Sequence, residues 1–261
     1  MAMPAEAQRI VLPDSRLAVS KRFGMYKEEP KQTVRNRTSK PNAIMDYILF
    51  AWTRCELEHC YAGTHNPFGD SYNVFLDALK ALNRNGIVYS SSDVARFAEI
   101  LPGLYDGDKN FYAKAGMFLS ALINNGKDES YEIWLSDSLA TLGNHLNSSI
   151  AFFGYENTKN ITVHGNVGWC PGYLMKSGEI VIEGNGGDYA GCFMEGGRLV
   201  VKGECGEWVG NHMSGGEIHL NNSSPIVYSS TGTVDNGKIY HKGELIVSCT
   251  GIYKTGIYKK R

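Results

Sequence analysis

Between residues 161 and 222, apolar and polar positions alternate in short segments that recur at a fixed spacing. Each segment opens with two apolar residues that are separated by one position, at 161 and 163, 180 and 182, 199 and 201, and 218 and 220. The step from one segment to the next is 19 residues each time. Such alternation is typical of a short β-strand with one buried face, so we predict four equivalent strands.

The same series of glycines follows each of the first three strands. Residues 180–197, IVIEGNGGDYAGCFMEGG, show the full pattern, and residues 161–178 and 199–216 match it in phase. Glycines at fixed phase predict corners where the backbone adopts angles that other residues resist. The glycines concerned are Gly165, Gly168, Gly172, Gly184, Gly187, Gly191, Gly203, Gly206 and Gly210.

The length of the repeat determines how the copies are arranged. A unit this short cannot bury its own apolar face, so it must stack on its neighbours. Strands and corners that repeat at one length and stack in register form a solenoid, with parallel strands about 4.8 Å apart. We therefore predict a parallel β-helix with 19-residue turns over residues 161–225.

Stacking turns each position of the repeat into a column of residues. Met175, Met194 and Met213 share one column, which we expect to point inward because a flexible thioether fills irregular space. A second column lies beside the strand and points outward; it contains His164, Glu183, Lys202 and Asn221. Glu183 and Lys202 carry opposite charges at adjacent levels, so we expect them to attract each other.

The apolar spacing before the repeats is helical instead. From Pro41 onward, apolar residues recur at steps of three and four, at positions 44, 47, 48, 51, 52 and 55. Further helices are predicted over residues 71–82, from a cap at Ser91 or Ser92 through Leu101, and over about 109–123. We interpret residues 42–130 as a helical domain and leave residues 131–160 as an unassigned junction.

The two ends of the stack need protection, because each exposes an apolar cross-section and unpaired backbone groups. The helical residues precede the first predicted turn and can cover that end. At the other end, Pro225 cannot donate to a strand ladder, and residues 238–247, KIYHKGELIV, predict two short strands around Gly243. We interpret residues 226–261 as a cap or a subunit interface.

The repeat also resembles a known pattern. Its glycine phase and its Met-x-Gly-Gly ending at Met194 resemble the glycine-repeat (GXGXG) β-helix of two families. One is the C-terminal domain of the glutamate synthase large subunit, and the other is the glycine-repeat subunit of formylmethanofuran dehydrogenase, to which the ending is more similar. The resemblance covers residues 161–222. It implies a right-handed β-helix that packs beside catalytic domains and supplies no catalytic residue.

Composition restricts the class of protein. Lysine and arginine total 26 against 27 aspartates and glutamates, which leaves no global field for nucleic acid or acidic lipid. No apolar run is long enough to span a bilayer, and the first residues contain no signal-peptide core. Six scattered cysteines do not form a disulfide framework, so we expect a cytoplasmic protein.

A basic run in residues 1–41 predicts an extended arm. Arms of this kind can contact nucleic acid, and so can the basic tail KTGIYKKR at the C-terminus. The few aromatic residues in these segments do not form a stacking platform, so packing against another subunit is favoured over nucleic-acid binding.

One cluster of residues has metal-ligand chemistry. Cys55 and His59 are one helical turn apart and could share a metal ion, with Cys60 or His65 completing tetrahedral zinc. The spacing matches no zinc module, and the alternative is that these are buried cysteines and surface histidines.

Other chemistry in the repeats is weaker. Cys192 or Cys205 could act as a nucleophile with His212, but Asp188 and Glu207 crowd the region and oppose a thiolate. The two carboxylates stack on each other and could instead hold a cation. The glycine-rich turns precede no helix and lack Gly-Lys-Ser/Thr, so neither a nucleotide nor another cofactor is predicted.

The expected fold class is α+β, with an N-terminal helical domain followed by a right-handed parallel β-helix. The expected function is a non-catalytic structural or assembly module, in a homo-oligomer or as a subunit or domain of a larger oxidoreductase or amidotransfer complex. The alternative is an autonomous enzyme or metal-binding protein whose site lies where the helices meet the β-helix.

Overall fold

A computed structural model describes residues 43–55, 67–83, 86–108, 110–135, 149–222, 236–248 and 251–252. The chain divides into two compact units, Met1–Lys40 and Pro41–Arg261. All described residues belong to the second unit, and the basic arm predicted for residues 1–41 lies outside them.

The helices begin and end close to the predicted positions. They are α2 (Ala43–Arg54), α3 (Pro67–Asn83), α4 (Ser91–Ile100), the 3-10 helix η1 (Leu101–Leu104) and α5 (Phe111–Asn125). Helix α3 starts earlier than residue 71, because proline fits the first turn of a helix, where no N–H is needed. The cap of α4 is Ser90, whose N–H donates to Asp93 Oδ2 at 2.9 Å, so the prediction of Ser91 or Ser92 was wrong by one position.

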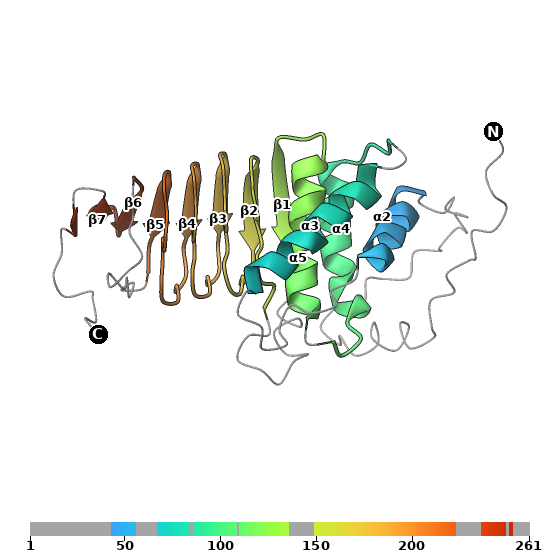
Figure 1. The fold of residues 1–261 in the computed structure, drawn as a ribbon, viewed down its shortest axis with the longest axis horizontal. Coiled ribbons are helices and arrows are strands. Elements are labelled where there is room, and N and C mark those ends of the chain that lie inside the picture. Colours follow the sequence, from blue (N-terminus) through green and yellow to red (C-terminus); the bar gives the residue numbers. More distant parts are fainter. Residues whose placement is uncertain are drawn as a thin grey trace, which may run out of the picture. The chain divides into compact units, whose positions relative to one another are not determined.

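The strands form one sheet in chain order, which Figure 1 shows as a single row. They are β1 (Ser130–Trp134), β2 (Asn160–His164), β3 (Glu179–Ile182), β4 (Arg198–Val201), β5 (Glu217–Leu220), β6 (Lys238–His241), β7 (Glu244–Ser248) and β8 (Gly251–Ile252). Pairing is parallel from β1 to β6, and Ile161, Ile180 and Leu199 lie side by side in register. The predicted parallel β-helix with a 19-residue repeat is confirmed.

The β-helix begins earlier than the repeats indicate. Strand β1 pairs in parallel with β2, and Tyr131 lies opposite Ile161. Residues 131–135 and 149–160, as far as the structure describes this segment, therefore belong to a first coil, where the sequence indicated only a junction. The step between these two partners is 30 residues, which hides the coil from a search at the shorter period.

Beyond β5 the stack ends in a hairpin. Strand β6 still pairs in parallel with β5, but β7 returns antiparallel to β6. Lys242 and Gly243 form the turn, and both have positive φ, at 50° and 81°. Two such residues are what a tight hairpin turn requires. The predicted strands around Gly243 are thus β6 and β7.

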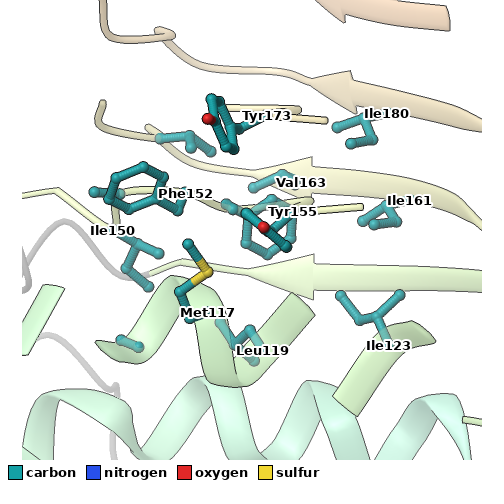
Figure 2. Close-up of a cluster of buried hydrophobic side chains, with 14 of the residues drawn as sticks. Met117, Leu119, Ile123, Ile150, Phe152, Tyr155, Ile161, Val163, Tyr173 and Ile180 are labelled. Atoms are coloured by element: carbon teal, nitrogen blue, oxygen red, sulfur yellow. The ribbon is translucent and has the colours of Figure 1, made fainter. Parts of the chain in front are cut away.

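At the other end, helix α5 packs on the first coil. In Figure 2, Met117 of α5 points toward Ile150 and Phe152 of the coil. Helices and coils share one hydrophobic core, so α5 covers the apolar cross-section at this end of the stack.

A buried serine adds polar bonds to that contact. The Ser120 hydroxyl oxygen accepts the N–H groups of Gly154 at 2.9 Å and Tyr155 at 3.1 Å. It donates to the carbonyl of Gly116 at 2.7 Å within α5. One side chain thus satisfies two buried backbone donors of the coil, which would otherwise cost free energy in an apolar contact.

The methionines of the repeat lie inside the coils. Met175, Met194 and Met213 each have 0% exposure. The Met175 Cε lies 2.7 Å from the point that a Cβ at Gly197 would occupy, and Met194 Cε stands in the same relation to Gly216. The glycine pair that follows each methionine therefore leaves room for the methyl group of the methionine in the coil before it.

The sequence predicted that all nine glycines adopt backbone angles that other residues resist, and this is wrong for five of them. Four of the nine adopt positive φ, namely Gly165, Gly172, Gly191 and Gly210. At Gly191, φ is 68° and a Cβ would overlap the side chain of Ile218 in the core. Left-handed backbone is not found at Gly168, Gly184, Gly187, Gly203 and Gly206. A Cβ at Gly187 would lie 2.5 Å from the carbonyl carbon of Gly168, so close backbone approach is the cause there.

We expect Gly187→Ala to lower the free energy of unfolding by about 1–3 kcal/mol, because the added methyl meets backbone that cannot rotate away. The measurement is urea denaturation followed by circular dichroism. Gly103→Ala is the matched control: a Cβ there has nothing within 4 Å, and φ is not positive. It should change stability by less than about 0.5 kcal/mol. Equal stability of the two variants would contradict the close approach.

Candidate functional site on the outer sheet face

The outer face of the sheet carries three rows of side chains, because alternate residues of each strand point away from the core. The first row contains Glu179, Arg198, Glu217 and Lys238, one from each of β3 to β6. The middle row contains one residue from each of β1 to β6, in register: Glu132, Thr162, Val181, Val200, His219 and Tyr240. The third row runs from Trp134 on β1 and His164 on β2 to Glu183 and Lys202, which follow β3 and β4. We call the face formed by these rows the outer sheet face.

Charges in the first row are paired from strand to strand. Arg198 Nη1 lies 2.9 Å from Glu179 Oε1, and Lys238 Nζ lies 3.5 Å from Glu217 Oε1. His219 Nε2 is 3.2 Å from the other oxygen of Glu217. The hydrogen bond with His219, together with Lys238, lowers the pKa of the Glu217 carboxyl group. Negative and positive side chains therefore alternate along the first row, and ion pairs between neighbouring strands order them.

Glu183 is the centre of the third row. Its Oε2 lies 2.7 Å from His164 Nδ1 and its Oε1 lies 2.9 Å from Lys202 Nζ. Hydrogen bonds from Lys202 and His164 lower the pKa of its carboxyl group. The sequence predicted the attraction between Glu183 and Lys202, and the distance confirms it. Glu183 and Lys202 are exposed, so their pairing orders the face more than it stabilises the fold.

The β1 end of the outer sheet face combines an exposed aromatic ring of the third row with a carboxylate of the middle row. The Trp134 side chain is 46% exposed, and its indole stacks on the His164 ring at 4.6 Å between centroids. Glu132, two residues before Trp134 on the same face, has an oxygen 3.8 Å from His164 Nε2. The sequence analysis missed both residues, because they belong to the first coil, and the 30-residue step to the next strand does not match the 19-residue repeat.

The structure describes one of the four predicted metal ligands. Cys55 is fully buried at the end of α2, and its thiol donates to the carbonyl of Ala51 at 3.4 Å. Burial raises the pKa of Cys55 to about 12, which opposes the thiolate that a metal would need. His59, Cys60 and His65 lie outside the described residues, so zinc binding there stays a prediction. No group of three or more potential ligands from His, Cys, Asp and Glu occurs within the described ranges.

The candidate nucleophiles Cys192 and Cys205 lie in surroundings that disfavour the thiolate. Burial raises the pKa of Cys192 and of Cys205 to about 12 each. The ring of His212 stacks on Phe193 at 4.9 Å. Both thiols therefore stay protonated at neutral pH. A cysteine nucleophile must be a thiolate, so neither thiol is activated.

Of the two stacked acidic residues, Asp188 uses its carboxylate in a structural role. Asp188 Oδ1 accepts the N–H of Glu207 in the next coil at 2.8 Å. In another column, Asn166 Oδ1 accepts the N–H of Asn185, and Asn185 Oδ1 accepts that of Glu204, both at 2.8 Å. These side chains bond to backbone donors 19 residues further on. The recurrence of asparagine at that spacing was the available signal, and the sequence reasoning did not use it.

We expect Cys192 and Cys205 to resist alkylation by iodoacetamide in the native protein at pH 7.5. Their raised pKa leaves a negligible thiolate fraction, and at the fully buried Cys192 burial also excludes the reagent. Residue-resolved mass spectrometry measures the labelling, with the urea-unfolded chain as a control that should react fully. Labelling of either native cysteine faster than in the unfolded chain would favour the nucleophile hypothesis.

Comparisons with known proteins assign no family: no protein-family model, curated protein or solved structure matches the chain significantly. Among the described helices, none has both the length and the apolar content needed to cross a membrane.

Proposed function

We propose that this chain is a non-catalytic structural module that assembles with another protein, as a subunit or domain of a larger oxidoreductase or amidotransfer complex. The type of complex comes from the resemblance of residues 161–222 to the glycine-repeat β-helices of glutamate synthase and formylmethanofuran dehydrogenase. Three consecutive copies in one phase support that resemblance.

The observation that carries the proposal is the composition of the outer sheet face. Its middle row is apolar at Val181 and Val200, and rows of paired charges lie on both sides. An apolar centre within a polar rim is typical of protein–protein interfaces. Because the face is built on sheet backbone, it is rigid before binding, which lowers the entropy cost of association.

The use of polar groups inside the repeats agrees with a structural role. Asp188 and the stacked asparagines bond to the next coil, and the described cysteines of the repeats are held as thiols. The carboxylate and amide groups thus hold one coil to the next, and the cysteines are in the unreactive thiol form. The proposed activity of the complex belongs to the partner.

The test is to purify the tagged chain from the cells in which it occurs and to measure the mass of the particle by multi-angle light scattering. We expect an assembly with a fixed ratio to an enzyme subunit, heavier than the 28.8 kDa chain. Val181→Arg should release the partner without lowering the melting temperature. Ser177→Arg, at an exposed corner position, is the matched control and should leave the assembly intact.

Three results would contradict the proposal. They are a monomer in native extract, a particle built only of this chain, and substrate turnover by the purified chain alone. Metal analysis of the same sample addresses the alternative function, since one zinc ion per chain, lost in Cys60→Ser, would restore the metal-protein hypothesis.

A further inference from the structure

One carboxylate on the outer sheet face lacks the kind of partner that the others have. Four acidic side chains on the strands or directly beside them lie within ion-pair distance of a lysine or arginine; the pairs are Glu129–Lys159, Glu179–Arg198, Glu183–Lys202 and Glu217–Lys238. Among the described residues, the basic group near Glu132 is only His164 Nε2, at 3.8 Å. The Glu132 side chain is 64% exposed. Glu132 therefore has no lysine or arginine within ion-pair distance among the described residues, and a cation from outside can reach its carboxylate.

An aromatic ring lies beside that carboxylate. Glu132 and Trp134 are two positions apart on β1, and both point to the outer side. This spacing places their Cα atoms about 7 Å apart along the strand. One face of the indole stacks on His164 of β2. Strand β1 is the first strand in the sheet order and helix α4 packs against it, yet Trp134 stays 46% exposed.

His164 fixes the position of the ring. Its Nδ1 is held by Glu183 at 2.7 Å, and Glu183 is in turn held by Lys202. Its ring lies nearly parallel to the indole, with an angle of 17° between the planes. The indole thus rests on a support that is itself hydrogen-bonded to the next strand. A ligand that stacks on the exposed part of Trp134 does not have to order the ring first.

We propose that Glu132 and Trp134 form a binding subsite for a guanidinium group, presented by an arginine on the partner protein. This inference rests on the proposed function. A planar guanidinium can stack on an indole and donate two parallel N–H groups to a carboxylate. Lysine has a compact ammonium that cannot do both, so the subsite distinguishes the two cations. An anionic ligand is repelled by Glu132.

The test uses N-acetylarginine amide as the probe, with N-acetyllysine amide for comparison, on the full chain. The indole N–H signal of Trp134 is followed in ¹H–¹⁵N spectra and assigned by its absence in Trp134→Phe. We expect a saturable shift with the arginine probe and a dissociation constant at least about tenfold weaker for the lysine probe, the ratio that corresponds to one lost good contact. Glu132→Gln should weaken arginine binding by a similar factor.

Glu129→Gln is the matched control, because it removes an exposed carboxylate near the start of β1 that is already paired with Lys159. It should change arginine binding by less than about twofold, as expected for a screened charge outside the contact. Melting temperatures verify that each variant is folded. Equal responses to both probes, or an arginine response that survives Glu132→Gln, would overturn the subsite.

The experiment also separates the subsite from the assembly. If Glu132→Gln abolishes binding of the probe but the complex in native extract keeps its composition and its affinity, the docking role of the subsite is wrong and the structural function stands. If the probe binds as described but the chain is monomeric in native extract, the proposed function is wrong and the guanidinium site remains.

Discussion

Met194→Asp should abolish cooperative folding of the β-helix. Met194 is fully buried, and its methyl group lies under Gly216 of the next coil. An aspartate at this position buries a charge without a partner, which costs about 3–5 kcal/mol. That loss is comparable with the free energy of unfolding of a typical domain, which is about 5–15 kcal/mol. Far-ultraviolet circular dichroism and urea denaturation measure the result.

Ser214→Asp is the control for this change. Ser214 is an exposed residue of a neighbouring corner, one position after Met213, so the variant adds the same carboxylate to the outside of the coil. It should melt within a few degrees of the parent protein. If Met194→Asp also melts like the parent, the methionine column does not form the interior of the coils.

Gly116→Ala should destabilise the protein although alanine is the better helix former. In an ordinary helix this substitution stabilises by about 0.5–1 kcal/mol. Here a Cβ on α5 would overlap the carbonyl oxygen of Ala151 and lie 2.9 Å from its carbonyl carbon. Helix and coil must move apart, which we expect to cost about 3 kcal/mol or more. The urea midpoint and the change in its slope measure the effect.

The sign of that change is diagnostic of the contact between α5 and the first coil. Gly103→Ala again serves as control, because it adds a methyl group within the helical part where space is open. A gain in stability for Gly116→Ala would show that α5 does not approach the coil this closely. A loss for both variants would indicate a general effect of replacing glycine.

The regular part of the β-helix could be predicted because its signals are local and repeated. Alternation of apolar residues specifies which side of a strand is buried, and the constant step between copies places equivalent residues in one column. For this reason Glu183 and Lys202 could be paired before their distance was known. The helices could be predicted for the same reason, since each apolar face recurs within a few residues.

Contacts between distant segments could not be predicted in the same way. The first coil has a step of 30 residues, so Glu132 and Trp134 join the outer sheet face only when β1 pairs with β2. The close approach at Gly116 depends on where α5 meets Ala151, a residue of a coil that lies further along the chain. Likewise, whether Gly187 is needed for its own backbone angle or for the space it leaves is decided by the neighbouring coil.

The sequence by itself determined the strand period, the inward and outward sides of each strand and the class of fold, because these follow from the order of neighbouring residues. The tertiary structure alone decided where the stack begins, how α5 closes that end and which side chains meet on the outer sheet face. Those features depend on packing between segments whose separation in the chain varies, and a local pattern carries no information about it.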